Sequence, residues 1–348
     1  MPAPPPVPDT PPASSLPPAA PRLQFLSPAW YAIVMGLAGL ALAWLRAQPL
    51  LGAPAVGVAL ALGVLAAAAF AVLALASALR LRRHPEAWAA DLKHPVRHAF
   101  TAAIPVSIIL LATVAVAADW RAAPVAWLWW IGSLGQWLVT WWTLARWWRG
   151  SAAGGLAWPV LTPVLIIPVV GNVLAPLAGV PLGYGAWSAA QFGAGLLLWP
   201  VVLALLMVRI ATQGLWPERM LPSSFILIAP PAVVGLALLQ FGAPELLAWM
   251  FWGMALFALS WAGALARRLQ ALPFGLPHWG MSFPLAALAA LTLRLAGGAG
   301  GAFGTLALGL LALASVVIAA LALGTWRGLR DGTLLAPEPV AVLQPAGR

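Results

Sequence analysis

The sequence predicts an all-α, polytopic membrane protein with ten transmembrane helices. Three observations lead to this fold class: the composition, the spacing of apolar runs and the placement of basic residues. Hydrophobic residues make up 63% of the 348 residues and charged residues 7%, whereas soluble domains carry roughly 45–50% and about 25%. So few charges cannot cover a folded body in water, but a surface that faces lipid needs none. A soluble globule is therefore excluded.

Apolar runs follow one another with little sequence between them. Crossing about 30 Å of hydrocarbon takes about 20 helical residues, and each run is long enough. The predicted spans are residues 27–45, 54–79, 98–118, 124–145, 159–180, 186–208, 222–241, 244–266, 273–293 and 301–326. We therefore expect a ten-helix transmembrane channel domain over residues 27–326.

The two ends of the chain are expected to be tails. Residues 1–21 contain ten prolines and almost no charge, so they lack the basic and apolar regions of a signal peptide. This composition predicts a disordered, polyproline-like cytoplasmic tail over residues 1–26. Residues 327–348 are predicted to form a short cytoplasmic tail.

The basic residues predict the orientation, because cytoplasmic loops retain Lys and Arg. With a cytoplasmic N-terminus, that side receives fifteen of the eighteen Lys and Arg residues. The other side receives Arg46, Arg121 and Arg294. This bias fits an even number of spans in the plasma membrane, the inner membrane of a bacterium, with both termini cytoplasmic. The net charge of +10 is scattered between apolar runs, which does not favour a nucleic-acid partner.

Prolines are concentrated in the odd-numbered spans. A proline removes a backbone hydrogen bond and kinks a membrane helix. Mid-span prolines in odd spans are Pro105, Pro163, Pro168, Pro230, Pro231 and Pro284, whereas Pro200 is the comparable one in an even span. The pattern predicts five helical hairpins, each with a kinked inner helix and a straighter outer helix, around a central path.

Ionisable groups are nearly missing from the predicted spans, where Glu245 is the one carboxylate and Asp, Lys and Arg do not occur. Proton-coupled transporters and cation channels place such groups inside the membrane. An anion can instead be stabilised by helix ends and backbone N–H groups. A neutral path with a basic cytoplasmic rim therefore favours anions, although an occluded structural bundle also lacks buried charge.

Several motifs resemble the tellurite-resistance/dicarboxylate transporter family, which includes the plant slow-type guard-cell anion channels. The resemblance runs from about residue 28 to residue 326 and leaves out the tails. The motifs are residues 91–98 (DLKHPVRH) leading into 99–105 (AFTAAIP), 30–36 (WYAIVMG), 170–176 (VGNVLAP), 228–231 (IAPP) and 279–284 (WGMSFP).

The resemblance implies a barrel of five hairpins, a homotrimer and an anion pore through each protomer. It also implies an aromatic plug on the ninth helix, which falls on Phe283, with Gly36 as a small residue opposite the plug. Periodicity alone favours Phe283 as one of eleven phenylalanines that pack a helix interface, and the motif shifts the interpretation to the plug. The expected residues that line or kink the pore are Gly36, Pro105, Pro168, Asn172, Pro230, Pro231 and Pro284. The Asn172 amide either donates to a permeating anion or caps a freed carbonyl.

A basic group of residues precedes the third span: Lys93, His94, Arg97 and His98. We expect this group to attract anions at the cytoplasmic rim or to meet lipid phosphates. A metal site is not expected, because no carboxylate shares a metal-ligand spacing with these histidines. No cofactor is expected either, and the chain has no Cys.

Two functions remain after an enzyme is set aside, since no nucleophile and base, paired carboxylates or metal cluster is apparent. The favoured function is an anion channel that conducts small anions through a neutral pore with an aromatic gate. The alternative is a secondary transporter or efflux protein for a C4-dicarboxylate, sulfite, tellurite or a toxic compound.

Overall fold

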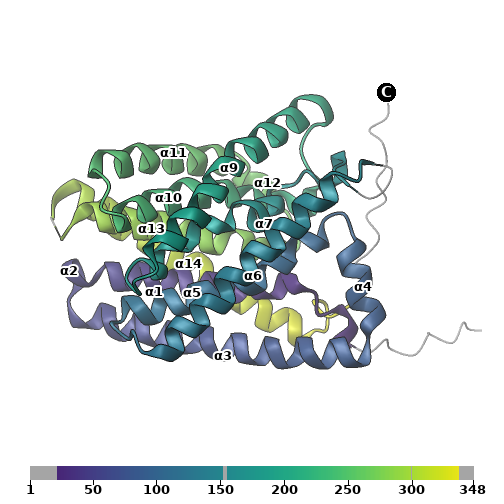
Figure 1. The fold of residues 1–348 in the computed structure, drawn as a ribbon, viewed down its shortest axis with the longest axis horizontal. Helices are drawn as coiled ribbons and strands as arrows, with labels where there is room; N and C mark the ends of the chain where they lie inside the picture. The colour runs from purple at the N-terminus through teal and green to yellow at the C-terminus, as the bar shows by residue number, and fades with distance from the viewer. Residues whose placement is uncertain (1–21, 152–154, 299, 337–348) are drawn as a thin grey trace, which may run out of the picture.

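The structure is a computed structural model that describes residues 22–151, 155–298 and 300–336. The described residues fold into a bundle of long helices whose axes run roughly along one direction (Figure 1). Most of the tail expected at residues 1–26 lies outside the described residues, as does the end of the tail expected at residues 327–348. The described part of the first tail contains a 3₁₀ turn, η1 (Arg22–Phe25).

Five inner segments form the centre of the bundle. Each of them combines 3₁₀ and α-helical turns. Their bounds are η2 (Pro28–Tyr31) with α1 (Ala32–Arg46); η3 (Arg97–Ala102) with α5 (Ala103–Ala117); η6 (Pro163–Leu165), α7 (Ile166–Val170), η7 (Gly171–Leu174) and α8 (Pro176–Gly179); η8 (Glu218–Ile228) with α10 (Ala229–Gln240); and η9 (Leu276–Met281) with α13 (Ser282–Ala296).

Longer, straighter helices cover these segments. They are α3 (Ala53–Arg83), α6 (Ala123–Trp147), α9 (Gly185–Gln213), α11 (Glu245–Gly263) and α14 (Gly301–Arg330). The connections contain α2 (Gln48–Leu51), α4 (Pro85–Lys93), η5 (Trp158–Val160) and α12 (Ala266–Gln270). Each covering helix packs against the inner segment that precedes it in the chain.

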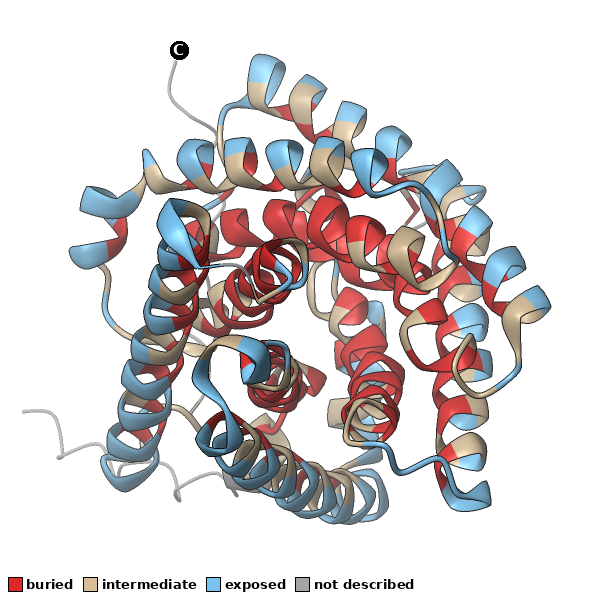
Figure 2. Cartoon of the chain, turned by 90° about the vertical axis from the view of Figure 1, so that its left-hand side faces the viewer, coloured by how far each residue is buried: buried red, intermediate tan, exposed pale blue. Residues whose placement is uncertain are grey.

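Burial separates the inner from the outer helices. In the most apolar stretch of four inner segments, 72–89% of residues are buried, against 17–33% in α3, α9, α11 and α14. Figure 2 shows the same division, with buried helices at the centre and exposed faces turned outward. The outer helix α3 buries only a narrow stripe of mostly small residues, Ala55, Ala59, Ala66, Leu73 and Arg80, so most of its surface is left for lipid.

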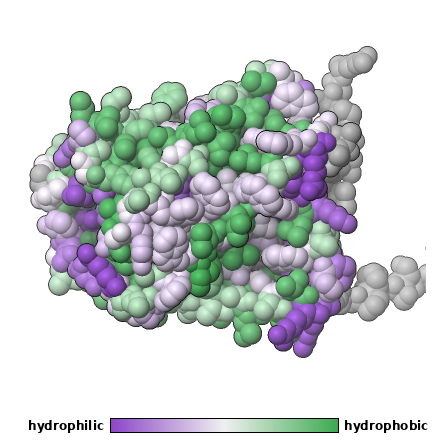
Figure 3. Space-filling view, viewed as in Figure 1, coloured by the Kyte–Doolittle hydropathy of each residue, from purple (hydrophilic) through white to green (hydrophobic). Residues whose placement is uncertain are grey.

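The apolar middle and the polar ends of the molecule fit a membrane. Among the described residues, eight helices are long and apolar enough to cross one, and Pro163–Gly179 is a shorter apolar stretch. The helix α6 has the length, but its many tryptophans lower its mean hydropathy. In Figure 3 hydrophobic and near-neutral residues make up most of the middle of the visible face, and the most hydrophilic residues lie toward its two ends. The chain is therefore an all-helical, multi-pass membrane protein.

The prolines of the inner segments mark changes in helix type. Pro105, Pro230, Pro231 and Pro284 lie in the first turn of an α-helix that follows a 3₁₀ segment. A proline cannot donate the α-type hydrogen bond to the preceding turn, so that turn tightens into a 3₁₀ helix. In contrast, Pro200 lies inside the continuous helix α9.

The fifth span is more broken than a single kinked helix. It consists of η6, α7, η7 and α8, of which the longest has five residues, and Pro163, Pro168 and Pro176 lie in η6, α7 and α8. Such short pieces leave backbone carbonyls without donors of their own helix. Neighbouring side chains must then supply the missing hydrogen bonds.

Contacts between the inner segments lead around the centre and back to the start. The helix α1 packs against α5, α5 against η7 and α8, η7 and α8 against α10, α10 against α13, and α13 against α1. The two described ends of the chain meet at one small pocket of about 40 Å³, which Phe25, Ser27, Leu334 and Ala336 line together with Arg80, Asp91 and Arg97. Both ends therefore lie at the same end of the bundle as the connection between α3 and α5.

Candidate functional site

A cavity of about 70 Å³ lies among the inner segments. This volume exceeds the roughly 10–15 Å³ that one water molecule needs. Residues from all five inner segments line it, including Met35, Val106, Ile167, Gly171, Ser223, Pro230, Trp279, Phe283 and Pro284. No lining residue carries a charge. The cavity is thus a neutral, mostly apolar compartment between helices that are far apart in sequence.

Phe283 lies in the wall of this cavity, on the first turn of α13, and is 8% exposed. Its ring packs against Gly39 of α1, where an added Cβ would lie 2.8 Å from Phe283 Cδ2. Gly36 faces a different part of α13, since a Cβ there would lie 2.4 Å from Ser282 Oγ. The glycine against the ring is therefore Gly39 rather than Gly36.

The 3₁₀ segment that precedes Phe283 is held firmly in place. Trp279 Nε1 donates a hydrogen bond of 2.8 Å to Thr325 Oγ1 of α14. The Ser282 hydroxyl donates to the carbonyl of Trp279 at 2.6 Å. Because both bonds are buried, the backbone beside Phe283 is anchored to an outer helix.

Of the other residues expected to line or kink the pore, the structure brings two to the cavity. Pro230 and Pro284 line it together with Phe283. Pro105, Pro168 and Pro231 are buried in the inner segments but are not among the lining residues. Their place in the first turn or break of a segment shapes the backbone instead.

Asn172 belongs to a buried polar network behind the cavity wall. Its Nδ2 donates to Thr140 Oγ1 at 2.7 Å, and its Oδ1 accepts from Gln191 Nε2 at 2.9 Å. The carbonyl of Pro168 is instead bonded by Gln136 and Thr140 of α6. Sequence reasoning missed these two residues, although Ser133, Gln136, Thr140 and Thr143 recur at helical spacing on one buried face of α6.

The basic group before the third span divides between several environments. Lys93 is exposed, and His94 Nδ1 accepts from the backbone N–H groups of Val96 and Arg97, both at 3.1 Å. Burial, followed by the positive charge of Arg97, lowers the pKa of His94 below its usual value. His98 is 2% exposed and packs edge-on against Trp142 of α6.

Arg97 takes part in a buried ionic cluster at the same end. Asp91 is 1% exposed and pairs with Arg80 at 2.8 Å and with Arg97 at 3.2 Å. Arg80 Nε also donates to the carbonyl of Gln24 at 3.0 Å. These residues line the small pocket at the chain ends, which shares Leu276 with the central cavity. The cluster thus lies beside the cavity without lining it.

Within residues 22–151, 155–298 and 300–336, no three His, Asp or Glu side chains come together in a way that could hold a metal ion. His84 and Glu86 form a pair in which His84 Nδ1 lies 3.5 Å from a carboxylate oxygen.

An all-helical, multi-pass body with a neutral internal cavity defines the class of integral membrane channels and transporters. Residues 26–326 match the family described as voltage-dependent anion channel (SLAC1). The chain belongs to this family, whose members are channels and transporters of small anions and not enzymes. The family resemblance found in the motifs is thereby confirmed.

Individual relatives agree with this assignment. The chain is 28% identical to the "Tellurite resistance protein TehA homolog" of Haemophilus influenzae, over 75% of this chain and 78% of the relative. It is 26% identical to an uncharacterized transporter of Methanocaldococcus jannaschii, over 76% and 81%. It is also 26% identical to "S-type anion channel SLAH2" of Arabidopsis thaliana, over 39% of this chain and 26% of the plant protein.

Proposed function

We propose that this protein is a plasma-membrane anion channel whose path runs through the central cavity and is closed by Phe283. The observation that carries the proposal is the convergence of all five inner segments on one uncharged cavity with Phe283 in its wall. A cation in this cavity would meet an uncompensated low-dielectric barrier of several kcal/mol. We expect an anion to be stabilised instead by helix ends and backbone N–H groups, which need no full charge.

The proposed architecture has ten spans, arranged as five hairpins in a ring around the pore. Eight of them are the long apolar helices, and α6 and the broken fifth segment are the other two. Both termini are cytoplasmic, residues 27–326 form the channel domain, and 1–26 and 327–348 are tails. The meeting of both described chain ends at one pocket supports the even number of spans. The homotrimer is proposed from the family resemblance. The proposed location is the plasma membrane, which in a bacterium is the inner membrane.

Phe283 closes the path in this proposal because its ring fills the cavity wall between α1 and α13. The roles proposed for Gly36, Pro105, Pro168, Pro230, Pro231 and Pro284 are to let the inner segments approach and turn. Lys93, His94, Arg97 and His98 remain a proposed cytoplasmic rim. Arg97 and Arg80 both pair with Asp91. The cluster of these three residues therefore keeps one net positive charge, which contributes to the proposed rim.

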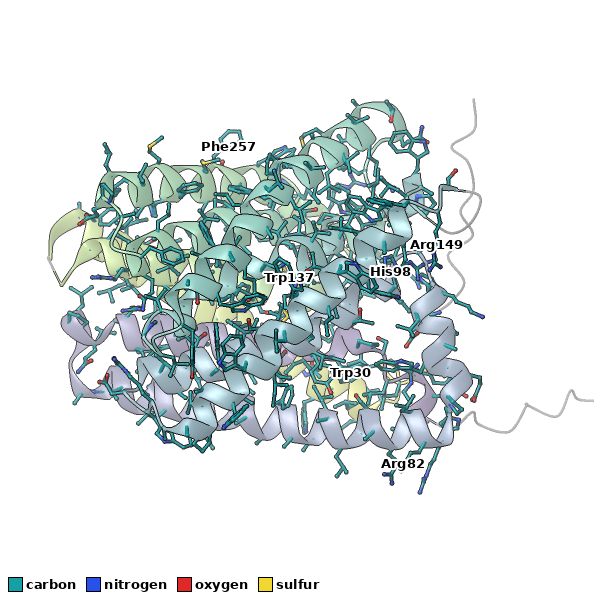
Figure 4. The ribbon with its side chains drawn as sticks, in the orientation of Figure 1. Trp30, Arg82, His98, Trp137, Arg149 and Phe257 are labelled. Carbon is teal, nitrogen blue, oxygen red and sulfur yellow. The ribbon has the colours of Figure 1, made fainter. Side chains whose placement is uncertain are left out.

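The experiment compares chloride efflux from proteoliposomes containing wild type, Phe283→Ala, Phe283→Leu and Phe257→Ala. Flux is divided by the amount of folded protein from size-exclusion chromatography. Phe257 is the matched control, because it is 70% exposed on α11 and lies at the outer edge of the bundle (Figure 4). We expect Phe283→Ala to be well folded and leaky, Phe283→Leu to be intermediate and Phe257→Ala to resemble wild type.

A packing role for Phe283 gives a different result. Truncating a buried Phe in a core costs about 3–5 kcal/mol, so the yield of folded protein would drop while flux per folded molecule stayed at the wild-type value. That outcome would remove the gate assignment.

A coupled carrier for an oxyanion is the second candidate, favoured by the name of the Haemophilus relative, a tellurite resistance protein. The substrates considered are tellurite, sulfite, a C4-dicarboxylate or a toxic compound. Planar-bilayer recording separates the two functions, because unitary currents arise from a channel and not from a carrier. Their absence in Phe283→Ala would favour the carrier.

A further inference from the structure

A polar stripe on the outer helix α6 is hydrogen-bonded to the broken fifth segment. Gln136 Nε2 lies 3.1 Å from the carbonyl oxygen of Ile167 and 3.2 Å from that of Pro168. Thr140 Oγ1 lies 2.6 Å from the same Pro168 oxygen. Gln136 is fully buried and Thr140 is 6% exposed. Gln136 thus donates to two successive backbone carbonyls. The one hydroxyl hydrogen of Thr140, which also lies 2.8 Å from the carbonyl of Gln136, has its shorter contact with the second of them.

These carbonyls belong to α7, a single helical turn that ends at Val170. The last carbonyls of a helix lack intrahelical donors, and an unsatisfied carbonyl in a bilayer costs several kcal/mol. The donors on α6 therefore allow the chain to be broken at this depth. The Oε1 atom of Gln136 has no partner within the described residues, so the side chain takes part in these contacts through its donating end.

The network extends beyond the two carbonyls and fixes the next turn. Thr140 Oγ1 accepts from Asn172 Nδ2 at 2.7 Å, and Asn172 Oδ1 accepts from Gln191 Nε2 at 2.9 Å. Gln191 Nε2 also donates to the carbonyl of Ser133 at 3.0 Å. The fifth segment is consequently held to both α6 and α9 on the side away from the cavity.

The other side of the same segment is the cavity wall. Ile167 and Gly171 line the cavity. A Cβ added to Gly171 would lie 2.7 Å from Gln136 Nε2 and 3.1 Å from Val106 Cγ2. A single layer of backbone therefore separates the donors of α6 from the path, and any shift of these hydrogen bonds moves the wall.

We infer that Gln136 and Thr140 are positioning residues that hold the fifth segment outward and thereby set the width of the anion path. This inference rests on the proposed conduction through the cavity. Without the donors, the freed carbonyls of Ile167 and Pro168 turn toward the path. Their bulk narrows it, and the negative ends of their dipoles disfavour anions.

The test uses the full-length protein in planar bilayers, with Phe283→Ala as the open parent. Thr140→Val is added because it removes the donating hydroxyl at nearly constant volume. Thr143→Val is the matched control on the same helix, since Thr143 is fully buried and its hydroxyl has no partner in the described part of the chain. Reversal potentials with chloride on one side and gluconate on the other give the permeability ratio.

We expect Thr140→Val to lower the gluconate-to-chloride permeability ratio and the unitary chloride conductance several-fold, with Thr143→Val at the parent value. Thr140→Ser, which keeps the hydroxyl, should restore the parent ratio. Gln136→Met is a second variant that removes the amide donors. A purely structural role would lower the amount of folded protein without changing a ratio measured per open channel.

Two outcomes overturn the inference in distinguishable ways. Parent-like ratios in both Thr140→Val and Gln136→Met would show that α6 does not set the path, while conduction by Phe283→Ala itself would still support the channel. No anion current from Phe283→Ala would refute the proposed function and this inference with it.

Discussion

Replacing Gly39 by Ala tests whether the Phe283 ring is wedged against α1. The new Cβ would lie 2.8 Å from Phe283 Cδ2 and 3.3 Å from Ala286 Cβ. Carbon atoms pack at about 3.5–4.0 Å, so the ring must retreat by about 0.7 Å or more. Overpacking of this kind costs about 1–3 kcal/mol, whereas Gly→Ala inside a helix gains about 1 kcal/mol.

The Phe283→Ala background separates the cost of overpacking from the gain in helix propensity. The ring is gone there, so the new Cβ requires only a small adjustment at Ala286. There Gly39→Ala should be neutral or stabilising by up to about 1 kcal/mol, while in wild type it should destabilise. The coupling energy of the double-mutant cycle should therefore be about 1–3 kcal/mol.

The assay is unfolding by SDS titration in mixed micelles. Gly36→Ala is the control, because its Cβ would meet Ser282 Oγ at 2.4 Å and Ser282 Cβ at 2.7 Å. Its cost should be the same with and without the ring. An equal cost of Gly39→Ala in both backgrounds would refute the contact between Gly39 and the ring.

Three further predictions concern topology, selectivity and pH. In intact cells, single cysteines at Gln48 and Gly183 should react with an impermeant thiol reagent and one at Gly150 should not; labelling at Gly150 would reverse the orientation. Reversal potentials of Phe283→Ala in a KCl gradient should lie near the chloride equilibrium value, and a value near that of potassium would refute the anion path. The folded pKa of His94 is lowered, chiefly by burial and then by Arg97, so the folded state binds fewer protons than the unfolded state. Stability should be full above the unfolded value of about 6.5 and fall as pH drops below it. In His94→Asn this acid-dependent loss, measured by thermal unfolding, should be smaller; an unchanged loss would assign it to another group.

The sequence predicted the membrane class and the helical segments because both depend on local composition. The length of the apolar run at residues 54–79 is enough to predict a helix there. The helix α3 continues to Arg83, beyond the predicted end at residue 79. Arg82 and Arg83 are exposed, so their charged ends reach water beyond the hydrocarbon, whereas Arg80 is buried and paired with Asp91. Hydropathy therefore locates a span better than it locates the end of a helix.

The candidate site was less predictable because it depends on contacts between distant segments. The motif around Phe283 placed that residue in the ninth span, but which glycine of α1 meets the ring depends on the rotation of two helices about their axes. Gly36 and Gly39 are less than one turn apart, so the sequence does not distinguish them. Gln136 and Thr140 were missed because two polar residues in a tryptophan-rich span carry no motif, and only the carbonyls across the helix interface explain them.

The contact between α1 and α13 closes the circle of inner segments, and it joins parts of the chain more than two hundred residues apart. During synthesis, α1, α5, the fifth segment and α10 leave the ribosome before α13 exists, so the nascent bundle has an open side. Contacts of such high sequence separation form late and slowly. Because Phe283 lies on α13, the segment that completes the ring of inner helices also brings the aromatic side chain into the cavity wall. Under the proposed function, the path and its plug are therefore completed in the same step.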